Sequence, residues 1–283
     1  MAGTDLESMH RKPLTTGAAL SEATAESALA LTLGELSPAD PFRWLWRGGR
    51  DFVRCPHIGL VFGLCFALMG QALWLVFKSA PAYVLWLSAG FLLLGPFLCL
   101  GLYAVSRDLE QGKKPRLGAS LLAWRPILST TAIFAAVLLI LEMLWGRASL
   151  VVFAVTMKTM PSTENLLVVL LSAENLDFII AYAAVGSFFA GLIFLSSAIS
   201  IPMILDRQTD AISAAITSFR ACLQNPGSLL VWGCLVTTLT LLAMLPAFLG
   251  LLVVAPVLGH ASWHAYRQIV PPRDAAATQN SAL

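Results

Sequence analysis

Charge is scarce in this chain. Only 12% of its 283 residues are Asp, Glu, Lys or Arg, and 58% are apolar, whereas a soluble domain has about 25% charged and about 45–50% apolar residues. So few polar side chains cannot cover so many apolar ones in water, and the composition therefore predicts an integral membrane protein. The net charge of +2 is small and the basic residues are spread along the chain, so we expect no nucleic acid partner.

Motifs of catalysis and metal binding are missing as well. The five cysteines are odd in number and have no C-x-x-C spacing, which argues against a disulfide framework or a cysteine-based metal site. The chain has no G-x-S-x-G, no H-E-x-x-H and no phosphate-binding loop. We therefore expect a protein that is not an enzyme and holds no cofactor.

Long apolar runs are what the chain has in abundance. They predict an all-α fold, a polytopic helical membrane protein with six transmembrane helices in residues 40–270, between disordered cytoplasmic tails at 1–39 and 271–283. Each run is about as long as a bilayer core of about 30 Å is thick. Residues 146–177 form the longest predicted connection outside the membrane. The predicted spans are Ile58–Phe77, Tyr83–Val105, Ile127–Trp145, Phe178–Leu205, Ser228–Leu245 and Phe248–Tyr266, with the last turn marked by Pro246 and Gly250.

Three amphipathic segments are too polar to cross a membrane: Pro41–Arg54, Leu117–Trp124 and Asp210–Leu223. Segments that combine aromatic or apolar residues with polar and basic ones lie in the plane of the interface. Their side follows from charge, because only three of the 18 Lys and Arg residues, Lys78, Arg147 and Lys158, fall in connections on the opposite side. The positive-inside rule then predicts cytoplasmic in-plane helices and two cytoplasmic termini.

Segments from the first and last parts of the chain are similar to one another. Residues 95–109, GPFLCLGLYAVSRDL, are similar to residues 255–269, APVLGHASWHAYRQI, and residues 55–63, CPHIGLVFG, are similar to residues 225–233, NPGSLLVWG. With a weaker middle copy, the pattern predicts a threefold parallel repeat of one in-plane helix, a proline and two antiparallel spans. The alternative is chance similarity among leucine-rich helices.

The repeat makes Arg107, Arg207 and Arg267 equivalent positions. Each is the first cation that follows an apolar span of the same polarity, where the negative end of the helix dipole favours it. We expect their Cα atoms at one depth, within about one helical turn (~5.4 Å). Trp263 should lie in the same layer, because tryptophan favours the headgroup level of a membrane.

Three histidines are candidate metal ligands. His260 and His264 are four residues apart on predicted span six and so share one face, and His57 begins span one at the same cytoplasmic edge. Two or three imidazoles can hold a transition metal or haem. The alternative is structural anchoring at the interface, because two histidines without a carboxylate or cysteine partner make a poor metal site.

Glu142 is the only acid inside a predicted span. A carboxylate in the membrane is costly and is therefore a candidate for a proton or cation path, with pairing to Arg147 or snorkelling as the alternative. Pro96, Pro202 and Pro256 interrupt the even-numbered spans. Broken helices can line a transport site, although a proline can also merely bend a span.

Four segments carry a resemblance to a known family: FRWLWRGGRDFVRCP, GFLLLGPFLCLGLYAVSRDLEQG, SIPMILDR and GHASWHAYR. In this order they resemble an uncharacterised bacterial family of predicted integral membrane proteins, catalogued as domain of unknown function 2189. The resemblance covers roughly residues 40–270 and implies a six-span protein of the cell inner membrane. It implies little about any chemical activity. Some similar proteins carry the label cytochrome c oxidase subunit I-like, but such a subunit has six haem and copper histidines and this chain has four histidines in all.

Three functions are compatible with these patterns. The sequence favours a membrane scaffold or binding protein without a catalytic site, whose partners are the lipid bilayer and other membrane proteins. The second is a small transporter or channel that uses the proline-broken even-numbered helices. The third is a metal- or haem-binding protein linked to the respiratory chain through His260 and His264.

Overall fold

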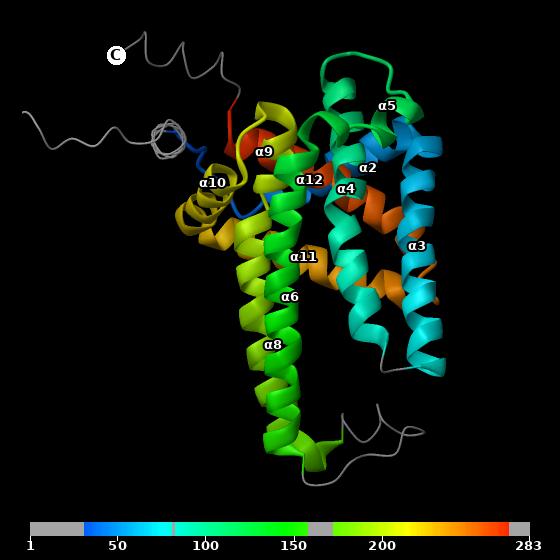
Figure 1. The fold of residues 1–283 in the computed structure, drawn as a ribbon. Coiled ribbons are helices and arrows are strands. Elements are labelled where there is room, and N and C mark those ends of the chain that lie inside the picture. Colours follow the sequence, from blue (N-terminus) through cyan, green and yellow to red (C-terminus); the bar gives the residue numbers. More distant parts are fainter. Residues whose placement is uncertain (1–30, 81–82, 158–171, 272–283) are drawn as a thin grey trace, which may run out of the picture.

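Every secondary-structure element that the computed structural model describes is a helix (Figure 1). The described residues are 31–80, 83–157 and 172–271, with the side chains of 84–86, 88, 89, 92, 93 and 173 set aside. The predicted all-α class is confirmed for this part of the chain. The helices are α2 Asp40–Arg54, α3 Pro56–Ser79, α4 Val84–Glu110, α5 Leu117–Leu121, η2 Arg125–Ile127, α6 Leu128–Thr156, η4 Ala173–Asn175, α8 Leu176–Ser197, α9 Ser200–Arg207, α10 Ala211–Gln224, α11 Pro226–Met244 and α12 Leu251–Ile269.

Four helical stretches among these residues are long and apolar enough to cross a membrane: Pro56–Ser79, Leu117–Thr156, Leu176–Arg207 and Pro226–Met244. They contain the predicted spans one, three, four and five, in agreement with a multi-pass helical membrane protein. The predicted spans two and six, α4 and α12, are not among the four, so the number six is not confirmed. For α12 the reason is its last ten residues, HASWHAYRQI, which are rich in polar side chains.

α12 is in contact with helices from several parts of the chain. α2 and α3 pack along it, and α4, α9 and α11 also contact it. Trp263, Tyr266 and Ile269 in its second half are completely buried. Because this half of α12 is surrounded by protein, it does not need the apolar composition of a helix that faces lipid.

Two glycines let neighbouring helices approach α12 closely. A Cβ atom on Gly63 of α3 would lie 2.1 Å from the carbonyl oxygen of Leu252, and one on Gly48 of α2 would lie 2.5 Å from the carbonyl oxygen of Val257. Both distances are shorter than a van der Waals contact, and the atoms that would be struck are backbone atoms. The packing of α2 and α3 on α12 therefore depends on the absence of a side chain at these two positions.

Two elements differ from the sequence prediction. α6 runs without a break to Thr156, so residues 146–156 continue this helix instead of forming part of a connection. Gly146 does not end it, because one glycine costs a helix only about 1 kcal/mol relative to alanine. Predicted span four, in contrast, is split into α8 and α9, because Pro202 lacks an N–H group and its ring clashes with the carbonyl group four residues earlier. The remainder of the connection, 158–171, lies outside the described residues.

The last 42 residues of the predicted membrane domain form two helices and not one. α11 and α12 are joined by a turn over residues 245–250, as predicted from Pro246 and Gly250. Ala247 and Phe248 take up φ angles of 50° and 63°, a left-handed conformation that reverses the chain without glycine. The Gln71 side chain of α3 donates a hydrogen bond to the Ala247 carbonyl group and holds this turn in place.

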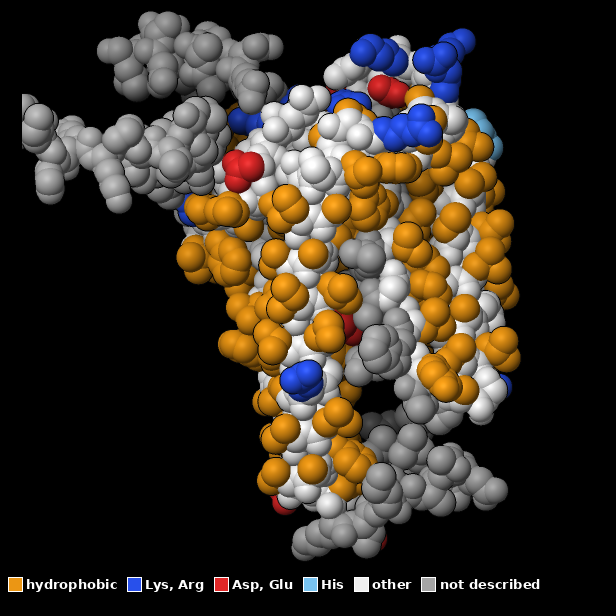
Figure 2. All heavy atoms as spheres, viewed as in Figure 1, with side chains coloured by type: hydrophobic (Ala, Val, Ile, Leu, Met, Phe, Trp, Pro, Cys, Tyr) orange, Lys and Arg blue, Asp and Glu red, His pale blue; other side chains and the backbone are white. Residues whose placement is uncertain are grey.

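Helices α2, α5 and α10 coincide with the three segments predicted to lie in plane, although α5 is only five residues long. They lie toward the upper end of the molecule in Figure 1. Figure 2 shows that Lys and Arg side chains gather at this end, whereas hydrophobic side chains cover the flanks below it. We call it the basic end.

Residues 31–39, which the sequence analysis assigned to a disordered tail, belong to the packed domain. The Asn225 side chain accepts a hydrogen bond from the Leu36 N–H group at 2.9 Å and donates one to the Gly34 carbonyl group at 3.1 Å. The Gly34 N–H group donates to the Ile269 carbonyl group at 2.9 Å. These contacts correct the predicted boundary of the tail and bring the two described ends of the chain side by side at the basic end.

Candidate functional site

Two sites flank the last turns of α4. Ser106 and Glu110 face α12, whereas Ala104, Arg107 and Asp108 line a cavity on another side of the helix. We call the first the α12 network and the second the basic pocket. The α12 network consists of polar side chains that bond to one another around that helix: Asp51, Ser106, Glu110, Asp206, His260, Trp263, His264, Tyr266 and Arg267.

Asp51 of α2 is the centre of one half of the α12 network. Its side chain is buried, with 2% of the residue exposed. The Ser106 hydroxyl group donates a hydrogen bond to its Oδ2 atom at 3.0 Å, and His264 donates to the same atom from Nε2 at 2.8 Å. Position 51 follows Trp44 and Gly48 on the face of α2 that packs against α12, so packing of the helix carries the carboxylate into the protein.

The environment of Asp51 stabilises its ionised form. Burial by itself raises the pKa of a carboxyl group, because it disfavours the charged state. The hydrogen bond from His264 and the charge of that imidazole, followed by the Ser106 hydrogen bond, outweigh burial and hold the pKa of Asp51 below its usual value of 3.8. The carboxylate is therefore a fixed anion that joins α2, α4 and α12.

His260 extends this half of the network toward the interior. Its Nδ1 atom lies 2.8 Å from the Ser106 hydroxyl oxygen. Because the single Ser106 proton is directed to Asp51, His260 is the donor in this contact, and its Nε2 atom is then an acceptor. That atom is buried and has no hydrogen-bond partner among the described residues.

Glu110 and Asp206 organise the other half of the network. Glu110 accepts hydrogen bonds from the indole N–H group of Trp263 and from Nε of Arg267, both at 3.0 Å. Arg267 also forms an ion pair with Asp206 at 3.5 Å, and the Tyr266 hydroxyl group donates to Asp206 at 2.6 Å. The last residues of α4, α9 and α12 are thereby tied together by two carboxylates.

The three arginines predicted to be equivalent meet at these helix ends. Arg107 of α4 donates to the Leu205 carbonyl group of α9 at 3.4 Å. Arg207 of α9 donates to the Tyr266 hydroxyl group of α12 at 3.3 Å, and Arg267 of α12 returns to α4 through Glu110. Each arginine therefore contacts the next helix in a closed cycle, and the threefold repeat itself stays a prediction.

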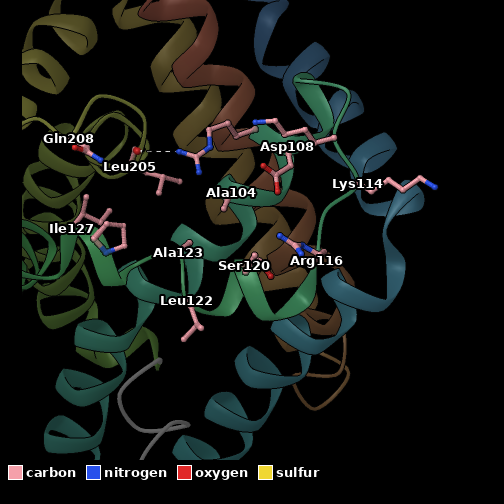
Figure 3. A pocket seen from close by; sticks show the side chains of 14 residues that line it. Ala104, Asp108, Lys114, Arg116, Ser120, Leu122, Ala123, Ile127, Leu205 and Gln208 are labelled. Atoms are coloured by element: carbon pink, nitrogen blue, oxygen red, sulfur yellow. Dashed lines mark hydrogen bonds between the residues drawn. The ribbon is translucent and has the colours of Figure 1, made fainter.

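The basic pocket is a cavity of about 620 Å³ between the end of α4, α5, η2 and the end of α9 (Figure 3). Arg116 and Asp108 point toward one another across the space between α4 and the loop that follows it, whereas Lys114 points outward. The residues that line the pocket are Ala104, Arg107, Asp108, Lys113, Lys114, Arg116, Ala119, Ser120, Leu122, Ala123, Pro126, Ile127, Leu205 and Gln208.

The remaining predicted site residues are not brought into either site. His57 is exposed in the first turn of α3, and Glu142 lies half-buried on α6. Within residues 31–80, 83–157 and 172–271, no group of three or more His, Cys, Asp or Glu side chains is placed to hold a metal ion. His264 contacts Asp51 directly and His260 is connected to it through Ser106, and the metal or haem hypothesis gains no support from their placement. All five cysteines are free thiols.

The sequence analysis missed the partners of the residues that it singled out. Asp51 was not singled out because its segment is rich in arginine. Its spacing from Trp44 and Gly48 nevertheless places all three residues on one face of a helix. Glu110 and Asp206 were recognisable as acids directly beside the expected cytoplasmic arginines. Nothing in the sequence showed that Lys114 and Arg116 face a cavity, because that depends on how the loop after α4 folds.

A family model described as predicted integral membrane protein (DUF2189) matches residues 84–206. The matched segment runs from the start of α4 to the end of α9 and contains Ser106, Glu110 and Asp206, together with nearly all of the basic pocket. No curated protein and no solved structure matches the chain. The resemblance found in the sequence is therefore confirmed over this segment, from α4 to α9, which is similar to the DUF2189 family of predicted integral membrane proteins.

Proposed function

We propose that this protein is a non-catalytic scaffold of the inner membrane, which binds a membrane component at its basic end. The observation that supports the proposal best is the α12 network. Its carboxylates are already bonded to side chains of the same protein, and Asp51 is buried, so they are poorly placed to bind or transform a substrate. They are well placed to fix α2, α4, α9 and α12 as a rigid platform.

The proposal places the basic end in the cytoplasm, with six spans and both termini on that side. α2 supports this orientation, because Phe42, Trp46 and Val53 on its outer face are 57%, 66% and 74% exposed. Arg50 lies over the Trp46 ring at 5.1 Å. A helix that exposes aromatic side chains beside arginines suits the headgroup region of a membrane.

The scaffold function can be tested by purifying the full chain in a mild detergent and identifying co-purified lipids and proteins by mass spectrometry. We expect one membrane component to be retained in a constant ratio through successive chromatography steps. Haem absorbance or stoichiometric metal in the same preparation would instead favour the third hypothesis. Loss of every membrane component under mild conditions would contradict the proposal.

The topology is tested separately with a reporter fused after Ala247, in the turn between α11 and α12. Six spans and cytoplasmic termini predict that this reporter lies outside the cytoplasm. A control fusion after Gly112, in the loop after α4, should lie inside. A cytoplasmic result after Ala247 would mean that α11 and α12 do not both cross the membrane.

Transport is the second candidate, and one observation favours it. His260 has a buried Nε2 atom with no partner among the described residues, and it lies one turn after Pro256 on α12, beside Ser106 of α4. Both helices contain an internal proline. Proteoliposomes loaded with a pH-sensitive dye test this function: a flux that His260→Gln abolishes would support it, and equal leakage with and without the protein would exclude proton transport.

A further inference from the structure

Cations outnumber acids in the basic pocket. Four cationic side chains, Arg107, Lys113, Lys114 and Arg116, line it together with a single carboxylate, Asp108. Lys113 donates to Gln111 at 2.7 Å, a neutral partner. Among the described residues none of these four cations forms an ion pair with a carboxylate, whereas Arg267 in the α12 network forms two. An excess of about three positive charges around one cavity favours the binding of an anion.

Arg107 and Arg116 have hydrogen-bond donors left for such an anion. A guanidinium group has five N–H donors, and Arg107 uses one of them for the Leu205 carbonyl group. Figure 3 shows the side chain of Arg116 directed into the space beside Asp108 and Ala104. Paired N–H donors on a planar cation match the oxygens of a phosphate group.

The loop that carries the lysines is held in one conformation. Gly112 has a φ angle of +70°, which a side chain would disfavour, and it ends α4 in a left-handed turn. The Gly112 N–H group donates to the Leu109 carbonyl group at 3.1 Å, and the Lys113 N–H group donates to the Asp108 carbonyl group at 2.8 Å. The loop is thus pre-organised over the pocket, which lowers the entropy cost of binding.

Exposed leucines lie in the lining of the pocket and next to it in the sequence. Leu122 lines it, and Leu121, Leu122 and Leu128 are 40%, 43% and 46% exposed. Cations above exposed leucines are arranged in the same order as a lipid headgroup above its acyl chains. The cavity of about 620 Å³ is larger than a phosphate ion needs and is within the usual range of about 300–1,000 Å³ for a ligand site.

We propose that the basic pocket binds a phosphate-bearing anion, held by Arg107 and Arg116 within it and by Lys114 at its mouth. The phosphate belongs either to the headgroup of an anionic phospholipid or to a soluble phosphate compound. In the first case the inference rests on the proposed function, because it names the chemical class of the membrane component that the scaffold binds, and in the second case it goes beyond that function.

The test uses the full chain in detergent, with phosphatidylglycerol, phosphatidylcholine and inorganic phosphate as three separate probes and native mass spectrometry as the readout. The key variant is Lys114→Gln/Arg116→Gln. The matched control is Lys78→Gln/Arg147→Gln, which removes the same charge from exposed positions at the end of α3 and in the second half of α6. At about 1 kcal/mol for each cation at an anionic lipid, the pocket variant should bind phosphatidylglycerol roughly 30-fold more weakly, and the control should change binding by less than about threefold.

A gain of affinity provides a second test that misfolding cannot imitate. Asp108→Asn removes the one carboxylate that lines the pocket and should strengthen phosphate or phosphatidylglycerol binding by about fivefold, as expected for about 1 kcal/mol of repulsion. Weaker or unchanged binding in this variant would overturn the inference, as would equal losses in the pocket variant and the control variant.

The three probes separate the two sources of phosphate. Preference for phosphatidylglycerol over phosphatidylcholine, lost in the pocket variant, identifies a lipid headgroup. Binding of inorganic phosphate without lipid preference, lost in the same variant, identifies a soluble compound. Binding of none of the three probes overturns the inference. If the wild-type protein keeps a membrane component that the pocket variant also keeps, the inference fails and the scaffold function stands; if the wild type keeps none, the scaffold function fails too.

Discussion

Arg267 and Arg116 both lie near the C-terminal end of α4, but the charges around them differ. Arg267 contacts Glu110 at 3.0 Å and Asp206 at 3.5 Å, and its neighbour Trp263 is completely buried. Arg116 is exposed, lines an open cavity, and shares it with three other cations and one acid. The first arrangement satisfies a charge within the fold, and the second leaves charges available to a ligand.

The function of a polar cluster therefore depends less on the number of its polar groups than on how many of them are already paired with one another. The α12 network contains more polar groups than the basic pocket, including two histidines and three acids, and it resembles an active site more closely. Its groups are nevertheless bonded mainly to one another. The basic pocket has fewer groups and a large excess of one charge, which only an outside partner can neutralise.

The largest expected effect is the loss of Asp51. Asp51→Ala removes the acceptor of two donors, the buried Ser106 hydroxyl group and the partly buried His264 imidazole, and breaking a buried pair in this way costs about 3 kcal/mol. Thermal unfolding in detergent should show a fall in Tm of roughly 6–12 °C. Asp108→Ala in the basic pocket should leave Tm within about 2 °C or raise it. A similar fall in both variants would remove the contrast between the two sites.

A smaller loss is expected when the close approach of α2 to α12 is blocked. In Gly48→Ala the new Cβ atom would meet the carbonyl oxygen of Val257 and the backbone nitrogen of Ala261 at 2.5 and 2.6 Å, and overpacking of this kind costs about 1–3 kcal/mol. Gly118→Ala beside the basic pocket meets nothing within 4 Å and should be neutral or stabilising by up to about 1 kcal/mol. Tm values of the two variants test this, and a neutral Gly48→Ala would show that α12 packs differently.

The third effect isolates one hydrogen bond of the α12 network. Trp263→Phe keeps most of the buried ring and deletes the N–H group that donates to Glu110, so it should cost about 1 kcal/mol. Trp46→Phe, at a site that is 66% exposed, should cost less than about 0.5 kcal/mol. Chemical denaturation of both variants measures the difference. Equal costs would show that the Trp263 hydrogen bond contributes nothing to stability.

The smallest effect is a pH dependence that belongs to the network. The pKa of Asp51 lies below its usual value of 3.8, because the His264 and Ser106 hydrogen bonds outweigh burial. Its ionised form therefore stabilises the fold above that value, and this contribution is lost as the pH falls through the lower folded pKa. The difference in Tm between wild type and Asp51→Asn should be constant from pH 5 to 7 and should narrow in more acid buffer. A difference that widens on acidification would contradict this assignment.

Much of the fold was predictable from composition and helix punctuation. Long apolar runs identified α3, α6, α8 and α11, and Pro246 with Gly250 predicted the turn before α12. The central burial of α12 was not predictable, because its polar half read as the end of a span in the interface. Its polar side chains can be buried because three other helices contribute their partners Asp51, Glu110 and Asp206. Such pairings depend on tertiary contacts.

The candidate sites were also predictable only in part, because their pairings depend on tertiary contacts. Arg107, Arg207 and Arg267 were predicted to lie in one layer, and this stays a prediction, while each of them contacts another of the helices α4, α9 and α12. His57 was expected at the same cytoplasmic edge as His264, and it is exposed in the first turn of α3. The basic pocket was not anticipated, since its shape follows from the left-handed turn at Gly112 and not from any local motif.

The central claim, that the α12 network stabilises the fold and the basic pocket binds an anion, is tested most directly by removing one arginine from each site. Arg267→Gln and Arg116→Gln make the same change in charge, and both Tm and phosphatidylglycerol binding are measured for each variant. We predict that Arg267→Gln lowers Tm and keeps binding within about threefold, and that Arg116→Gln keeps Tm and weakens binding by about fivefold. If both variants change Tm and phosphatidylglycerol binding to the same extent, the α12 network and the basic pocket do not have separate roles.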